Sequence, residues 1–179
     1  MSKGFVTIGI DTEVDRIKYS HALALSIKQS DPKSEFCLVV DEDGSSKVPS
    51  QYYEAFDYIV ELPFGNTAFK DGFHGMNLWQ LLHCSPFEET IYLDSDTLVK
   101  NVNTDILWDQ FEPYDMAISP IARTYRNYLT DKTHKFEIEL HYDLPKLYNN
   151  FIYFKRDSDL AIEWFKMADP VFQNWRDVY

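Results

Sequence analysis

The chain has 179 residues, of which 45% are hydrophobic and 26% charged, a balance typical of one globular domain with a sizeable core. Its 29 acidic and 17 basic side chains give a formal net charge of −12, which disfavours nucleic acid and anionic membranes as partners. No apolar run approaches the roughly 18 residues of a membrane helix, and the first residues lack a signal-peptide layout. Because Cys37 and Cys84 have no metal-binding spacing, we expect a cytoplasmic protein without disulfides.

Strand-like and helix-like segments alternate along the first hundred residues. The expected strands are Phe5–Ile10, Phe36–Val40, Tyr58–Val60 and Thr90–Leu93. The expected helices are Val14–Ser30, a short helix capped by Ser50 and ending at Phe56, and Met76–His83. The first helix ends at Asp31-Pro32, because proline disfavours helical geometry in the residue before it.

The second half is less regular. Its expected elements are a helix at Ile106–Gln110, strands at Met116–Ser119 and Leu147–Phe154, a helix at Leu160–Met167 capped by Asp157 or Ser158, and a last helix opened by Asp169-Pro170. Alternating strands and helices predict an α/β sandwich with a mainly parallel central sheet. In such sheets ligands bind beyond the carboxyl ends of the strands, so these ends are the places to look for chemistry.

Two carboxylates, Asp94 and Asp96, follow the apolar strand residues Ile91-Tyr92-Leu93 directly. Acidic groups at the end of a buried strand are tolerated only where they are exposed or paired, and a cation is the simplest partner. Carboxylate oxygens suit Mg²⁺ or Mn²⁺, which complete their coordination with phosphates and water. A phosphate ester is therefore the indicated substrate, although Asp94 and Asp96 could instead cap the following turn.

Further segments accompany this motif in a fixed order: the strand Phe5–Ile8, the helix end Leu25–Gln29, then Ile91–Val99 around Asp94-Ser95-Asp96, Asn103–Leu107, and Leu147–Phe154. In this order they resemble the GT-A glycosyltransferases, and most closely the glycogenin and galactosyltransferase group called family 8. Ile91–Val99 resembles the DxD segment of that family, and Leu147–Phe154 is similar to its strand near the donor sugar. The resemblance covers about residues 5 to 155 and implies a single GT-A, Rossmann-like domain over residues 1–179.

The resemblance implies transfer of a hexose, with retention of configuration, from UDP-glucose or UDP-galactose to a glycan, lipid-linked or protein acceptor. A divalent cation, Mn²⁺ or Mg²⁺, would bridge Asp96 and the donor diphosphate, with Asp94 on the ribose or a metal-bound water. Asp96, Asn149 and Asn150 are the implied catalytic residues. The donor-binding residues are Thr7, Ile8, Gly9, Asp11, Arg16, Tyr19 and Asp41 toward uridine, Lys70 and His74 toward phosphate, and Asp94 and Ser95 in the motif. We expect the acceptor surface in the polar aromatic stretch Arg123–Asp143.

The sequence also departs from family 8. It contains no His-x-x-Gly-x-x-Lys segment, and Asn150-Phe151 stands where small residues are expected. Val39–Ser45 resembles a turn of family 2, an inverting group, for which Glu137, Glu139 or Asp143 could act as the base. Two other functions stay open: a silent sugar-nucleotide or glycan-binding module, since aromatic rings stack on sugars, and a haloacid dehalogenase-like phosphatase, whose motif, however, generally lies on the first strand.

Overall fold

The computed structural model describes residues 2–10, 14–67, 74–119 and 148–173. Six strands of this part form one sheet in the order β3-β2-β1-β4-β6-β5. The strands are β1 (Lys3–Ile8), β2 (Glu35–Val40), β3 (Tyr58–Glu61), β4 (Glu89–Leu93), β5 (Met116–Ser119) and β6 (Tyr148–Lys155). The pairs β3-β2, β2-β1 and β1-β4 are parallel, whereas β6 runs antiparallel to both β4 and β5. The predicted α/β fold with a mainly parallel sheet is confirmed.

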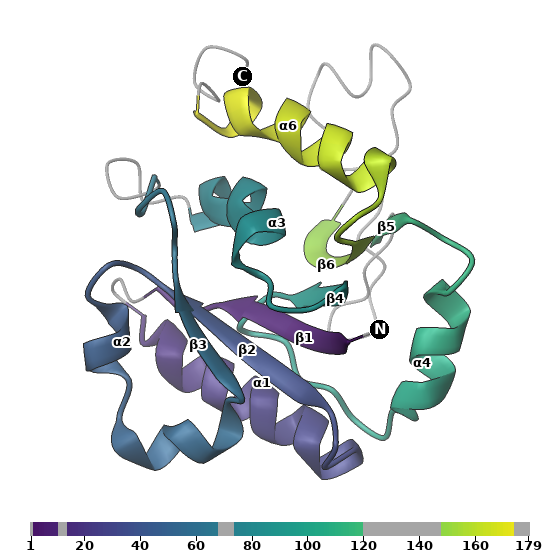
Figure 1. The fold of residues 1–179 in the computed structure, drawn as a ribbon. Coiled ribbons are helices and arrows are strands. Elements are labelled where there is room, and N and C mark those ends of the chain that lie inside the picture. Colours follow the sequence, from purple (N-terminus) through teal and green to yellow (C-terminus); the bar gives the residue numbers. More distant parts are fainter. Residues whose placement is uncertain (1, 11–13, 68–73, 120–147, 174–179) are drawn as a thin grey trace, which may run out of the picture.

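Helices cover both faces of the sheet, and Figure 1 shows α1 on one side with α3 and α6 on the other. The α-helices are α1 (Arg16–Ser30), α2 (Gly44–Lys47), α3 (Leu81–Cys84), α4 (Thr104–Phe111) and α6 (Asp159–Gln173), and the 3₁₀ helices are η1 (Ser50–Ala55) and η2 (His74–Gln80). None of the helices in the described part is long and apolar enough to cross a bilayer.

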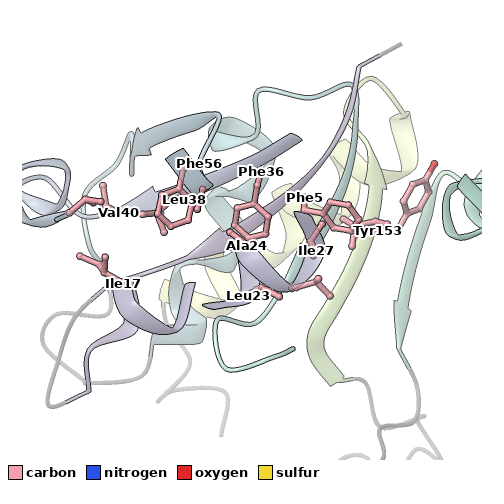
Figure 2. Packing of buried hydrophobic residues seen from close by; sticks show 14 of the residues in the cluster. Phe5, Ile17, Leu23, Ala24, Ile27, Phe36, Leu38, Val40, Phe56 and Tyr153 are labelled. Atoms are coloured by element: carbon pink, nitrogen blue, oxygen red, sulfur yellow. The ribbon is translucent and has the colours of Figure 1, made fainter. Parts of the chain in front are cut away.

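Apolar residues that alternate along the strands form one hydrophobic cluster on each face of the sheet. Figure 2 shows the cluster under α1, where Leu23, Ala24 and Ile27 pack against the strand residues Phe36 and Leu38. On the opposite face, Val6 and Tyr92 belong to a second cluster with residues of η2, α3 and α6. The central strands are therefore buried on both sides, and their carboxyl ends are the nearest places where polar groups can reach solvent.

The end of the sheet where β4 begins is held by the buried carboxylate of Glu89. It lies 3.3 Å from the Lys3 ammonium group of β1 and accepts a 2.9 Å hydrogen bond from the Tyr153 hydroxyl of β6. Glu89 and Lys3 are also direct partners in the parallel ladder. One carboxylate thus joins the three central strands, which fixes their register at this end.

Three sequence-based predictions about helices were wrong in detail. Ser50 lies inside η1 instead of capping it, because Pro49 occupies the preceding position. The expected helix Met76–His83 is a 3₁₀ helix followed by one short α-helix. Asp169-Pro170 opens no new helix, since Pro170 lies within α6, three residues before its end. The helix continues there although a proline removes one helical hydrogen bond and crowds the carbonyl four residues earlier.

Candidate functional site

The Asp94-Ser95-Asp96 turn leaves the carboxyl end of β4 and is held from both neighbouring strands. The Thr7 hydroxyl of β1 donates a buried 2.8 Å hydrogen bond to the carbonyl of Leu93, the last residue of β4. From the other side, the Asp94 amide donates to the Asn150 carbonyl of β6 at 3.1 Å. Within the turn, the Asp94 carboxylate accepts from the Ser95 amide at 2.8 Å. Both carboxylates therefore start from a backbone whose position is fixed.

Arg16 lies beside this turn, although 80 residues separate it from Asp96 in the chain. Its Nη1 is 3.7 Å from the Asp96 carboxylate and 3.4 Å from the Ser95 hydroxyl. Its Nε is buried and has no hydrogen-bond partner among the described residues. An unsatisfied buried donor costs about 1–3 kcal/mol. A ligand that offers an acceptor to Nε would therefore stabilise the Arg16 side chain.

Gly9 is the reason that α1 can bring Arg16 so close to the strand ends. A Cβ at this position would lie 2.7 Å from the Leu38 Cδ1 and 2.7 Å from the Ser20 hydroxyl oxygen, so only glycine fits without a shift. The Ser20 hydroxyl in turn donates to the Arg16 carbonyl at 2.8 Å. The start of α1, including Arg16, is therefore placed by a close contact with the segment that follows β1.

Tyr92 is a site residue that the sequence analysis did not identify. It is buried in β4, two residues before Asp94, and belongs to the hydrophobic cluster on the α3 and α6 face. Burial, and next the negative charges of Asp94 and Asp96, raise the pKa of the Tyr92 hydroxyl well above its usual value, while the charge of Arg16 opposes the shift. The phenol therefore stays neutral and lies within the electric field of all three groups; its position two residues before Asp94 could have revealed it.

The two asparagines differ in their surroundings. Asn149 is exposed, whereas the Asn150 side-chain oxygen is buried and finds no hydrogen-bond partner among the described residues. In the antiparallel ladder Phe151 faces Leu93, so Asn150 comes opposite Asp94. A buried amide oxygen without a donor, beside a carboxylate turn, is an acceptor position that a ligand hydroxyl or a cation can satisfy.

The other predicted donor residues are spread along the same edge of the sheet. Thr7 and Ile8 are buried, and Tyr19 is exposed on α1. Asp41 follows β2 and lies 3.7 Å from the Lys47 ammonium group. Arg16 is the one of these residues that is shown beside Asp96, whereas Asp41 is shown with Lys47. His74 begins η2, whereas Asp11, Lys70 and the stretch 123–143 lie outside the described residues.

The oxygen groups at the end of β4 suit a hard divalent cation. No group of three His, Cys, Asp or Glu side chains able to hold a metal occurs in the described part of the chain. The acidic side chains at the end of β4 are those of Asp94 and Asp96. The unpartnered Asn150 oxygen is a further candidate. Mg²⁺ and Mn²⁺ are commonly held by one or two carboxylates together with substrate phosphates and water. The residues present therefore fit such an ion, provided that a phosphate ligand accompanies it.

The chain is similar in structure to 117 chains of known structure, among them those of three proteins: LgtC, TarS and GlyE. The galactosyltransferase LgtC, solved with donor and acceptor sugar analogues, superposes with a TM-score of 0.60 at 13% identity over 96% of this chain and 69% of that one. S. aureus TarS (residues 1–349) gives a TM-score of 0.55 at 15% identity over 87% and 47%. The apo glycosyltransferase GlyE of Streptococcus pneumoniae TIGR4 gives 0.55 at 13% over 100% and 40%. No family profile and no curated protein sequence matches the chain.

These similarities establish the fold alone, because identities of 12–15% carry no information about individual site residues. The chain has a Rossmann-like α/β fold like that of these glycosyltransferases. It spans less than half the length of the TarS and GlyE chains. Activity, substrates and partners therefore have to be argued from the site itself.

We expect Gly9→Ala to lower the free energy of unfolding by about 1–3 kcal/mol, since the added methyl group overpacks Leu38 and Ser20. Ser20→Ala removes one of the two clashing atoms together with a hydrogen bond to Arg16. The double variant should therefore lose less stability than the sum of the single variants, measured by urea unfolding. Strictly additive losses would show that α1 does not depend on this contact.

Proposed function

We propose that the chain is a metal-dependent glycosyltransferase that moves a hexose from a UDP-sugar to an acceptor hydroxyl, with retention of configuration. One observation carries the proposal: the paired carboxylates Asp94 and Asp96 leave the central strand at the carboxyl edge of a sheet with this fold. The similarity to LgtC, whose structure holds donor and acceptor sugar analogues, supports a sugar-nucleotide ligand. The order of the family 8-like segments supports the same reaction.

Each carboxylate of the turn has a separate role in this proposal. The Asp96 side chain is 62% exposed, so it can hold Mn²⁺ or Mg²⁺ together with the donor diphosphate. Asp94 is half-buried, and its carboxylate accepts a hydrogen bond from the Ser95 amide. In the proposal this hydrogen bond orients the carboxylate toward the ribose or a metal-bound water. The ion, when bound, supplies Lewis-acid stabilisation of the departing diphosphate. The protein's own part is to hold both carboxylates on the backbone fixed by Thr7 and Asn150.

A nucleotide donor also needs positive charge, because both the chain and a diphosphate are anionic. Arg16, which was expected toward uridine, lies beside the turn and provides one cation there for the diphosphate. Lys70 and His74 are the proposed further phosphate contacts. The uridine would lie over the ends of β1 and β2, along residues 7–11, with Asp41 toward the base. Tyr19, exposed on α1, is available to stack on the uracil ring.

Asn149 and Asn150 would bind the donor sugar. The buried Asn150 oxygen lacks a donor among the described residues, and a sugar hydroxyl can supply one. An amide cannot remove a proton from the acceptor at neutral pH, so these residues orient the sugar and leave base catalysis to other groups. This arrangement agrees with the retaining reaction that the family 8 resemblance implies.

A second candidate function is a module that binds a sugar nucleotide without turnover. It is favoured by the ion pair between Arg16 and Asp96, which places a protein cation where an active enzyme needs a metal. Such a module would bind UDP and UDP-sugars but form neither free sugar nor a glycosylated product. An assay of UDP release, run with and without candidate acceptors, separates the two functions.

Asp96→Asn should weaken UDP binding in the presence of Mn²⁺ by about 100-fold or more, because it removes a charged metal ligand. Isothermal titration calorimetry with Mn²⁺, and with chelator instead, measures this effect. Asp109→Asn, which removes the same charge from an exposed position on α4, is the matched control and should bind like the wild type. Equal UDP binding by Asp96→Asn with and without chelator would exclude the metal role. The same titrations with GDP and dTDP identify the preferred base.

Asn150→Ala should weaken UDP-galactose or UDP-glucose binding three- to tenfold while leaving UDP binding unchanged, since one hydrogen bond to the sugar is lost. UDP thus serves as the internal control. Stability should change little, because the side-chain oxygen has no partner in the described structure to lose. A parallel loss of UDP affinity would place Asn150 at the nucleotide and refute its contact with the sugar.

The configuration of the product tests the proposed stereochemistry. From an α-linked donor such as UDP-glucose, we expect an α-linked product, observed by proton NMR of the new anomeric signal. A β-linked product would reject retention. In that case an acidic residue of the stretch 123–143 must act as the base, and replacing Glu137, Glu139 and Asp143 one at a time would identify it.

A further inference from the structure

The contact between Arg16 and Asp96 involves the carboxylate that the proposed function assigns to the metal. Nη1 and the carboxylate oxygen are 3.7 Å apart, and the two side chains are 28% and 62% exposed. A pair at this distance with a largely exposed carboxylate is weak, since water screens the carboxylate and neither group is held in a bidentate geometry. Either group can therefore leave the pair for a stronger partner.

The surroundings of Arg16 indicate what that better partner is. Its Nη1 lies 3.4 Å from the Ser95 hydroxyl, which is long for a hydrogen bond. Its Nε has no acceptor in the described part of the chain. A planar guanidinium with unused donors binds phosphate oxygens in a two-point arrangement that an exposed carboxylate at 3.7 Å does not provide.

The same contact affects a cation at Asp96. A divalent ion that binds there without a nucleotide must displace Arg16 and then remain close to its positive charge. Both effects weaken binding of the metal alone. Once Arg16 binds a phosphate, the ion no longer has to displace it from Asp96. The negative charge of the phosphate also compensates the positive charge of Arg16 near the ion.

We propose that Arg16 competes with a metal ion for Asp96 while the donor is absent. When the guanidinium binds the donor diphosphate instead, Asp96 becomes available to the ion. This inference rests on the proposed function and adds an order of binding to it: Arg16 binds the diphosphate first, and Asp96 then binds the ion. By thermodynamic linkage, the metal must strengthen nucleotide binding by the same factor as the nucleotide strengthens metal binding. Arg16 contributes a part of that factor.

The test is titration of Mn²⁺, followed by electron paramagnetic resonance of the free ion, with and without UDP. Arg16→Gln should bind Mn²⁺ alone roughly tenfold more tightly than the wild type, the size expected from losing a weak ion pair and a nearby like charge. Its binding of UDP without metal should weaken about tenfold. The coupling between Mn²⁺ and UDP should consequently be smaller than in the wild type.

Two further variants control for charge and for folding. Lys18→Gln removes the same charge from an exposed position two residues further along α1 and should bind both ligands within about twofold of the wild type. Arg16→Lys keeps the charge but lacks the planar fork, so it should stay near the wild type for Mn²⁺ alone and lose metal-free UDP affinity. Thermal unfolding of each variant confirms that it is folded.

Unchanged Mn²⁺ affinity in Arg16→Gln, or an equal gain in Lys18→Gln, would overturn the inference. Asp96→Asn, included in the same series, separates this failure from a failure of the proposed function. If Asp96→Asn loses Mn²⁺ binding in the presence of UDP while Arg16→Gln behaves like the wild type, the metal site stands and only the role of Arg16 is wrong. If Asp96→Asn binds Mn²⁺ normally, the metal site itself is wrong.

Discussion

Two hydrogen bonds at the end of β4 fix the backbone that carries the two carboxylates of the candidate site. The Thr7 hydroxyl holds the Leu93 carbonyl from the parallel side, and the Asn150 carbonyl holds the Asp94 amide from the antiparallel side. At the other end of the same strand, Glu89 joins all three central strands. The carboxylate turn therefore rests on a strand that is fixed at both ends. Such a rigid support is what a site needs if its charged groups are to be placed within fractions of an ångström.

Charge is the second constraint on this site, because the proposed donor is an anion and the chain carries a formal net charge of −12. The described structure pairs each of two acidic residues that follow a strand with a basic residue from a neighbouring helix, Asp41 with Lys47 and Asp96 with Arg16, both at 3.7 Å. These distances are too long for strong ion pairs. The two pairs lower the local negative charge in the absence of ligand. Because the pairs are weak, Lys47 and Arg16 can leave them for a phosphate at a small cost in free energy. The edge can thus accept an anion without a large rearrangement.

The sequence predicted the elements well, but it did not predict which of them meet. Apolar runs and the carboxylates after them locate β1, β2 and β4, because these patterns depend on a few neighbouring residues. The contact between Arg16 and Asp96 depends on β1 lying next to β4 and on Gly9 admitting α1, and neither is visible in local sequence. The helical Pro170 was mispredicted for the converse reason: local rules favour a break there, whereas α6 continues through it.

The topology also bears on the acceptor, whose expected surface lies outside the described residues. The residues that flank this part of the chain, Ser119 and Tyr148, are paired with each other across β5 and β6. Because β6 runs antiparallel to β4, its first residues lie at the carboxyl end of β4, where Phe151 faces Leu93. Ser119 and Tyr148 therefore lie toward the end of the sheet that carries the Asp94–Asp96 turn. In the proposed function the donor groups come from the ends of the strands, and the acceptor surface is expected in the part of the chain that follows β5 and precedes β6.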